Sequence, residues 1–100
     1  MPLALFTYSS FDRSLHGLGT EQKEIVQRIL KAVVVYYEAN CNLAEAQKLE
    51  PSFFYKQLRK PYYEAGVENN MRVVIKRQKS DCFAVLAGNH DQVKRFLASQ

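Results

Sequence analysis

Apolar side chains recur at every third or fourth position through the middle of the first half of the chain, and charged or amide side chains fill the positions between them. This period predicts an amphipathic helix that begins at Thr20, as its N-cap, and runs to about Ala39. The segment Val33–Tyr37 alone would suit a strand equally well, but the helical period continues through it. We expect the helix to bury its apolar stripe against a sheet, with Val26, Ile29, Leu30, Val33 and Tyr37 inside.

Shorter patterns flank this helix. Residues 3–8 are apolar and β-prone, which favours an opening strand, and a brief helix is expected to follow and to end at Gly17 or Gly19. Residues 42–49 begin with an Asn-x-x-Glu sequence that resembles a capping box, and a proline follows them, so they predict a second helix. The helices over residues 20–39 and 42–49 should form a hairpin because only a short loop joins them.

The second half of the chain changes to strand-like patterns. Tyr62–Val67 predicts one strand, Met71–Arg77 a second, and the almost entirely apolar Cys82–Ala87 a central strand. Polar turns are expected at residues 69–70 and 78–80. Alternation along the second strand sends Met71, Val73 and Ile75 to one face, and Arg72, Val74 and Lys76 to the other.

Asn89 and Gln92 predict the cap of a final helix that turns Val93, Phe96 and Leu97 toward the core. The last three strands, joined by short turns, should form a small antiparallel β-meander. The expected fold class is therefore α+β, as a single domain over residues 1–100. It has an N-terminal strand, the meander, the helical hairpin and a C-terminal helix. We expect the helices to cover one face and to leave the face of Arg72 open to solvent and ligand.

Composition favours a soluble, cytoplasmic protein that does not enter a membrane. Hydrophobic residues make up 47% of the chain, as in ordinary globular domains. The longest apolar run, Ala32–Tyr37, is far shorter than the roughly 20 residues of a membrane span. The first residues lack the basic region and the long apolar run of a signal peptide.

The cysteines and histidines show no metal-ligand spacing. Cys41 and Cys82 are far apart and neither belongs to a Cys-x-x-Cys pair, while His16 and His90 are the only histidines. We expect no metal and no small-molecule cofactor. Two reduced cysteines are favoured, and a single disulfide remains the alternative.

Positive charge is concentrated in the C-terminal part of the chain. Residues 1–55 carry five Lys and Arg against six acidic residues, a net charge of about −1, whereas residues 56–100 carry nine against four, a net charge of +5. This asymmetry indicates either a surface for a polyanion or acidic partner, or a basic face that only water contacts.

Four segments, in this order, carry a family resemblance: residues 6–18, Leu58-Arg59-Lys60-Pro61-Tyr62-Tyr63-Glu64, Asn70-Met71-Arg72-Val73-Val74-Ile75, and Leu86-Ala87-Gly88-Asn89-His90-Asp91-Gln92-Val93. With the order of the predicted elements, they make nearly the whole chain resemble the RelE/ParE toxin superfamily of bacterial type II toxin–antitoxin systems. The resemblance implies a RelE-like fold and a cognate antitoxin protein as partner.

The resemblance also implies a function. RelE-type members cut messenger RNA on the ribosome without a metal and so inhibit translation, which makes ribosome-bound mRNA the expected second partner. The alternatives are a non-catalytic ParE-type toxin that targets gyrase, and a degenerate RelE-fold protein that only binds an antitoxin-like partner or RNA. The sequence departs from active members near Gly66, where the strand lacks a basic residue, and at Glu64, whose negative charge would lie near an expected phosphate.

Arg72 and His90 are the candidate catalytic residues of such an endoribonuclease. In this reaction the ribose 2′-oxygen attacks the adjacent phosphate, a base accepts its proton and an acid protonates the leaving oxygen. Arg72 matches the superfamily's strand arginine, and a guanidinium suits the extra charge on phosphorus. His90, at a helix start, could transfer protons. Each also has a plain structural alternative, a strand arginine facing water and an exposed first-turn residue, and we expect both on one side of the sheet.

Other residues of the basic half are candidates for holding the RNA. Five cations could contact phosphates: Arg59, Lys60, Lys76, Arg77 and Lys94. Tyr62 or Tyr63 could stack on a base, although half-buried core positions are the alternative for these tyrosines.

Overall fold

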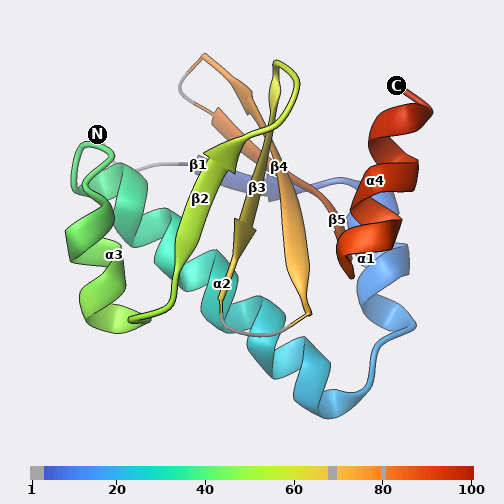
Figure 1. Cartoon of the computed structure of the whole chain (residues 1–100), viewed down its shortest axis with the longest axis horizontal. Helices are drawn as coiled ribbons and strands as arrows, with labels where there is room; N and C mark the ends of the chain where they lie inside the picture. The colour runs from blue at the N-terminus through green and yellow to red at the C-terminus, as the bar shows by residue number, and fades with distance from the viewer. Residues whose placement is uncertain (1–3, 68–69, 80) are drawn as a thin grey trace.

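One mixed sheet is the frame on which the helices pack (Figure 1). The computed structural model describes residues 4–67, 70–79 and 81–100. Across the sheet the strands follow the order β1 (Ala4–Thr7), β5 (Asp81–Gly88), β4 (Arg72–Gln78), β3 (Tyr62–Gly66) and β2 (Phe54–Gln57). β1 runs parallel to β5, and the other neighbouring strands are antiparallel. The α+β class and the antiparallel meander are confirmed, and β2 is a strand that the sequence pattern did not predict.

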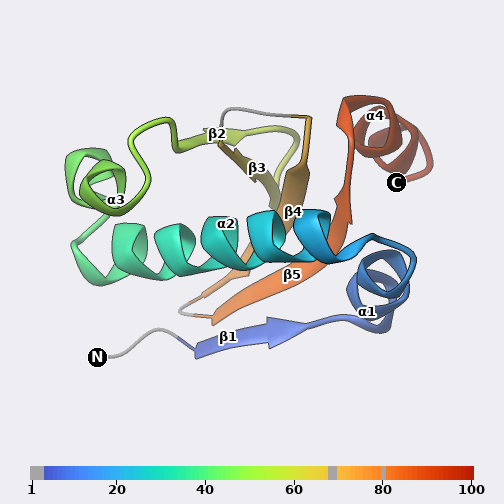
Figure 2. The same ribbon diagram turned by 90° about the horizontal axis from the view of Figure 1, so that it is seen from below.

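The helices lie on both sides of this sheet (Figure 2). They are α1 (Ser9–His16), α2 (Thr20–Glu38), α3 (Leu43–Leu49) and α4 (His90–Ala98). α2 crosses one face, whereas α4 packs on the opposite one. The expectation that the helices share one face is therefore wrong for α4, which covers part of the face that was expected to stay open.

Each face of the sheet has its own apolar cluster. α2 buries Val26, Ile29, Ala32 and Val33 against Met71, Val73 and Ile75 of the β4 region, while Leu30 and Tyr37 are partly buried. On the other face Val74 and Val85 pack against Val93 of α4. The alternation predicted along β4 is confirmed, and so is the buried stripe of α2. A register shift pairs Val74 with Leu86 and Ile75 with Ala84.

The helix α1 follows β1 and lies along the same edge of β5. After Tyr8, whose N–H donates to the carbonyl of Ala84 at 2.9 Å, two serines continue the contact. The hydroxyl of Ser10 donates to the carbonyl of Val85 at 2.6 Å, and that of Ser14 accepts from the N–H of Ala87 at 3.0 Å. Backbone groups that a strand would otherwise pair are thus satisfied by side chains.

The helical hairpin of α2 and α3 is confirmed. The side chain of Asn42 accepts from the N–H of Ala44 and caps α3, and the guanidinium of Arg28 on α2 forms an ion pair with Glu50 at the end of α3. One boundary differs: α2 has Gly19 rather than Thr20 as its N-cap, and the Gly19 N–H donates to the side chain of Gln22. Of the two predicted polar turns, residues 69 and 80 lie outside the described part of the chain, as does Leu3 of the predicted first strand.

Candidate functional site

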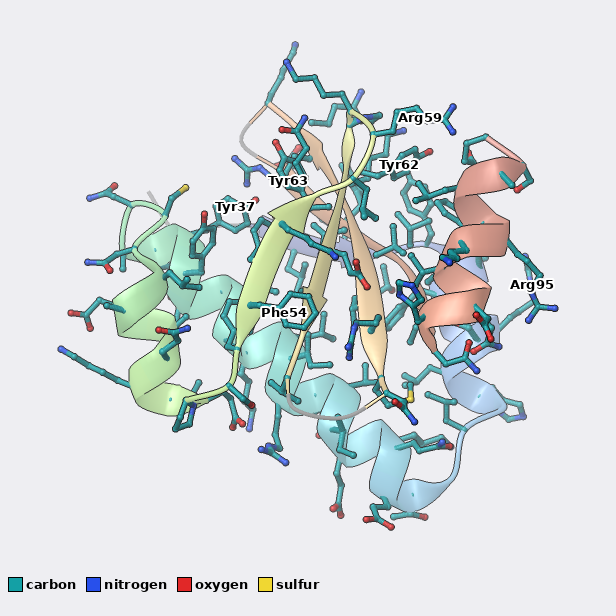
Figure 3. All side chains as sticks on the ribbon, viewed as in Figure 1. Tyr37, Phe54, Arg59, Tyr62, Tyr63 and Arg95 are labelled. Carbon is teal, nitrogen blue, oxygen red and sulfur yellow. The ribbon has the colours of Figure 1, made fainter. Side chains whose placement is uncertain are left out.

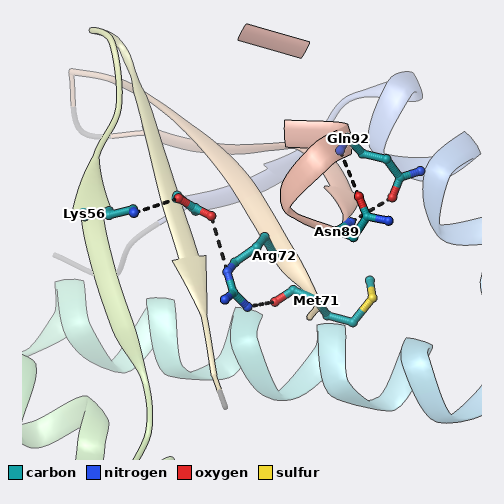
Figure 4. A network of polar contacts seen from close by, with 6 residues as sticks. Lys56, Met71, Arg72, Asn89 and Gln92 are labelled. Carbon is teal, nitrogen blue, oxygen red and sulfur yellow. Dashed lines mark hydrogen bonds and ion pairs between the residues drawn. The ribbon is translucent and has the colours of Figure 1, made fainter. Parts of the chain in front are cut away.

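Arg72, at the start of β4, contacts a carboxylate, a backbone carbonyl and an aromatic ring, and Figure 4 shows the polar contacts. Its Nε lies 3.4 Å from Oε1 of Glu64, and its Nη1 donates to the carbonyl of Met71 at 2.8 Å. Its guanidinium carbon lies 4.9 Å from the centre of the Phe54 ring, within the range of a cation–π contact. The side chain remains 20% exposed. The guanidinium therefore has a defined orientation and still reaches the surface.

Glu64 is the counter-ion of this arginine and is almost completely buried. Its side chain is 2% exposed, and its Oε2 lies 3.4 Å from Nζ of Lys56. The register explains the arrangement, because Lys56, Glu64 and Val74 are opposite one another on β2, β3 and β4. Oε1 accepts no hydrogen bond from the described residues. A buried carboxylate is costly unless charges compensate it, so Lys56 and Arg72 stabilise Glu64 as much as Glu64 orients them.

Gly66 allows Phe54 and Arg72 to meet across β3. The register aligns Phe54, Gly66 and Arg72, and a Cβ at position 66 would lie 2.7 Å from the Phe54 ring and 2.9 Å from Cδ of Arg72. Contacts that short force neighbours to move. Position 66, near which the strand lacks the basic residue of active family members, is thus covered by side chains from both neighbouring strands.

His90 is the first residue of α4 and is exposed. Asn89 precedes it and exchanges two hydrogen bonds with Gln92, which fixes the start of the helix (Figure 4). His90 lines an open hollow of about 240 Å³ with Asn70, Asn89 and Asp91. Since Gly88 is opposite Arg72 in the register and α4 packs on the Val74 face, His90 and Arg72 lie on the same side of the sheet.

Lys76 and Arg77 point to opposite faces of β4. Nζ of Lys76 donates to the hydroxyl of Tyr8 at 3.3 Å, on the face of Arg72. Arg77 lies on the α2 face, with its guanidinium carbon 4.1 Å from the centre of the Tyr37 ring. It donates to Sγ of Cys82 at 3.3 Å and to the carbonyl of Lys79 at 3.2 Å. Arg77 therefore does not share a face with Arg72.

Arg59 and Tyr62 hold the C-terminal end of α4 (Figure 3). Arg59 donates to the carbonyl of Leu97 at 3.2 Å, and the hydroxyl of Tyr62 donates to the side chain of Gln100 at 3.1 Å. The Tyr62 ring meets Phe96 edge-on at 5.3 Å. Both side chains therefore serve to hold α4 in place. Lys60 and Lys94 are exposed, on the β2–β3 turn and on α4.

Tyr63 belongs to an aromatic group on the α2 face. It stacks on Tyr55 with ring centres 5.3 Å apart, and the hydroxyls of Tyr55 and Tyr37 share a hydrogen bond. Burial raises the pKa of both Tyr37 and Tyr55, and burial likewise raises the pKa of the Cys82 thiol, although the nearby Arg77 opposes that rise. These groups stay protonated at neutral pH. Both cysteines are free thiols, so the alternative of a disulfide is not adopted.

The sequence pattern pointed to Arg72 but not to Phe54 or Lys56, and Glu64 was expected only as a negative charge near a phosphate. Alternation along β3 places Glu64 on the face of Arg72, and this signal is visible in the sequence. The pairing with Lys56 required knowledge of β2. No group of three or more His, Cys, Asp or Glu residues is arranged to bind a metal in the part of the chain that the structure describes. None of the described helices has the length and apolar character needed to cross a bilayer.

Comparison with known proteins shows a RelE-like fold. One matching chain is from the RelB–RelE antitoxin–toxin complex of Methanococcus jannaschii, with a TM-score of 0.62, 13% identity and coverage of 91% of this chain and 96% of that one. A copper-bound mutant toxin from Helicobacter pylori matches with a TM-score of 0.59 and 18% identity, and the match covers 91% of this chain and 98% of that one. A chain of the DinJ–YafQ complex of E. coli matches with a TM-score of 0.63 and 13% identity, over 89% of this chain and 94% of that one. No family model matches the sequence, and no curated protein matches it significantly.

Proposed function

We propose that the chain is the toxin of a type II toxin–antitoxin system and that a cognate antitoxin protein binds and inactivates it. The support is the fold, which covers nearly all of this chain and of the matching chains. One of these is described as a toxin, and the others come from complexes of RelB with RelE and of DinJ with YafQ.

The more specific proposal is that the chain cuts messenger RNA on the ribosome without a metal. One observation carries it: Arg72 is oriented by Glu64, Met71 and Phe54 and still reaches the surface. A guanidinium fixed in this way can stabilise the charge that develops on phosphorus when the ribose 2′-oxygen attacks. Such stabilisation is strong because the group needs no reorganisation during the reaction.

His90 supplies the proton transfers in this proposal. It lies exposed beside the open hollow at the start of α4, on the side of the sheet that Arg72 occupies. An imidazole has two ring nitrogens, and it can accept the proton of the 2′-hydroxyl or donate one to the leaving oxygen. Glu64 is a positioning residue for Arg72, because its own oxygens are buried.

One arginine and one histidine are a sparse catalytic set. We therefore propose that the ribosome holds the messenger RNA in line for attack, since orientation can supply roughly 7–11 kcal/mol of a barrier. Free RNA, which lacks this constraint, should be cut far more slowly.

A different observation favours a non-catalytic function as the second candidate. Arg72 already has a buried carboxylate as its counter-ion, and Gly66 leaves that part of β3 without a basic side chain. A phosphate would have to share Arg72 with Glu64. A ParE-type protein that acts on gyrase, or a RelE-fold protein that only binds an antitoxin-like partner or RNA, needs no free guanidinium.

Expression of the chain without a partner protein separates these functions. We expect growth arrest together with cleavage of ribosome-bound messenger RNA, detected as primer-extension stops, and little cleavage of the same RNA free in solution. The variant His90→Gln should reduce the stops, whereas His16→Gln, in α1, should not. Growth arrest with intact messenger RNA would favour the gyrase-type function. A folded protein that causes no arrest would favour the binding function.

A further inference from the structure

Positive charge gathers at one end of the sheet, where the β2–β3 turn lies beside the end of β4. We call this region the basic end, and it consists of Arg59, Lys60, Lys76, Arg77 and Lys79. The backbone N–H of Arg77 donates to the carbonyl of Pro61 at 3.0 Å, so the β2–β3 turn lies beside the last residues of β4, at the upper end of the sheet in Figure 1. Asp81 is the one acidic side chain among the described residues of the β2–β3 and β4–β5 turns and the strand ends next to them.

The basic end is remote from Arg72. Lys76 follows Arg72 by four residues along β4, and the strand ends at Gln78, six residues after Arg72, which corresponds to about 13 Å and 20 Å at the rise of a strand. A nucleotide bound at Arg72 therefore does not contact Lys79. Cations at this distance act on another stretch of a bound chain.

The exposed side chains of the basic end fit a phosphate backbone better than a protein partner. Arg59, Lys60 and Lys79 are exposed. The exposed large hydrophobic residues of the described chain are elsewhere, at Phe6 on β1 and at Leu43 and Leu49 on α3. Protein interfaces have apolar centres from which lysine is depleted, whereas Lys and Arg are the usual contacts to phosphate oxygens. Like charges at one end of the sheet repel each other, and a polyanion would offset this repulsion.

The helix α4 connects the basic end with the candidate catalytic pair. Arg59 binds the carbonyl of Leu97 near the C-terminal end of α4, and His90 is the first residue of the same helix. The nine residues of α4 span about 13 Å. RNA bound at the basic end would therefore be held at a fixed position relative to His90.

We propose that the basic end is a docking surface for the phosphate backbone of structured RNA, separate from the Arg72 and His90 pair. It rests on the proposed function only in that the docked RNA would present a cleavable strand to Arg72. Lys60 and Lys79 supply exposed positive charges for the phosphates, and Arg59 links this surface to α4 through its hydrogen bond to the carbonyl of Leu97. Of the residues of the basic end, Arg77 contributes its charge but does not contact the RNA, because its guanidinium packs on Tyr37 and binds Cys82.

The test compares two double variants with the same loss of charge. Lys60→Gln/Lys79→Gln removes the exposed lysines of the basic end, and Lys23→Gln/Lys31→Gln removes two lysines from α2. Binding of a 20-base-pair RNA duplex is measured between 50 and 200 mM salt. We expect the first variant to lose on the order of tenfold in affinity at low salt and to flatten the salt slope by about 2, and the control variant to bind as the wild type does. Thermal unfolding checks that both variants fold.

Three results would overturn the proposal. The wild type could show no salt-dependent binding of the duplex, or both double variants could lose the same duplex affinity. Lys60→Gln/Lys79→Gln could also lose binding to a poly-glutamate peptide while it keeps its affinity for the duplex. The last would assign the basic end to an acidic protein segment. The variant Arg72→Lys distinguishes this proposal from the catalytic one, because it should bind the duplex as the wild type does. Full duplex binding with no cleavage by the wild type would refute the nuclease and leave the docking surface supported.

Discussion

β4 carries two arginines five residues apart, and its alternation sends them to opposite faces of the sheet. Both rest on an aromatic ring, Arg72 on Phe54 and Arg77 on Tyr37. Their other partners differ. Arg72 has the buried carboxylate of Glu64, whereas Arg77 binds the neutral thiol of Cys82 and a backbone carbonyl. The comparison shows that a cation beside an aromatic ring does not by itself mark a nucleic-acid site.

The surroundings decide what each arginine can do. Arg77 closes the rim of the main core next to a tyrosine pair whose pKa values burial raises, and its donors are used to hold the β4–β5 turn. Arg72 lies on the face that α4 covers only in part, beside a compensating charge that keeps it in place. We therefore propose that Arg77 serves stability and Arg72 serves function, and the following predictions test that division.

The largest effect on cleavage is expected from loss of the Arg72 guanidinium. Arg72→Ala should reduce cleavage of ribosome-bound messenger RNA by about 10²–10³-fold, the usual cost of removing one preorganised donor. It also leaves the buried Glu64 with Lys56 alone, so it should lower stability as well. Arg72→Lys keeps a positive charge near Glu64 and should fold normally while restoring only part of the cleavage.

A double variant separates the two consequences. Arg72→Gln/Glu64→Gln removes both charges, and it should unfold in urea near the wild-type midpoint while remaining inactive. If the double variant cut messenger RNA at the wild-type rate, Arg72 would have no catalytic role, and the contrast between the two faces would fail.

Arg77→Ala should show the reverse pattern. It removes the donors to Cys82 and Lys79 and the contact with Tyr37, so we expect the free energy of unfolding to fall by about 1–3 kcal/mol. Cleavage per folded molecule should not change, since Arg77 faces α2. Urea unfolding and a cleavage assay normalised to folded protein measure both quantities. An inactive but fully stable Arg77→Ala protein would place this arginine in the RNA site instead.

The sequence pointed to Arg72 as a candidate, which stays a prediction, but it did not reveal the side chains that surround this arginine. Periodicity identified α2 and the alternation of β4, because strong patterns there agree with burial on one side. β2 was missed because the aromatic residues around the basic segment 56–61 were interpreted without a pairing partner. Which face α4 would cover was not predictable, because a short connection after Gly88 allows either side. Glu64 gained its role only once the register placed it between Lys56 and Arg72.

Gly66→Ala tests the same site with a smaller change. The added methyl group would lie within 3 Å of both Phe54 and Arg72, so we expect Arg72 to shift and cleavage to fall by about tenfold, with a loss of stability of about 1–3 kcal/mol from overpacking. Gly17→Ala is the matched control, because its Cβ would meet its nearest neighbour at 3.8 Å. Equal cleavage by both variants would show that the position of Arg72 over Phe54 does not matter.

The smallest effect concerns the tyrosines beside Arg77 and appears only at high pH. Burial raises the pKa of Tyr37 and Tyr55 above the ordinary value of about 10. Above that pH the unfolded chain loses these protons while the folded chain retains them, so the unfolded state becomes favoured. The stability present below pH 10 should fall by up to about 1.4 kcal/mol per pH unit for each tyrosine. Urea unfolding at pH 8 to 11 should show this loss in the wild type and a weaker one in Tyr37→Phe/Tyr55→Phe. The two proteins should differ by about 1 kcal/mol at pH 8, where only the shared hydroxyl contact separates them. Parallel pH profiles would mean that the hydroxyls reach water, and that the region of Arg77 is as open as that of Arg72.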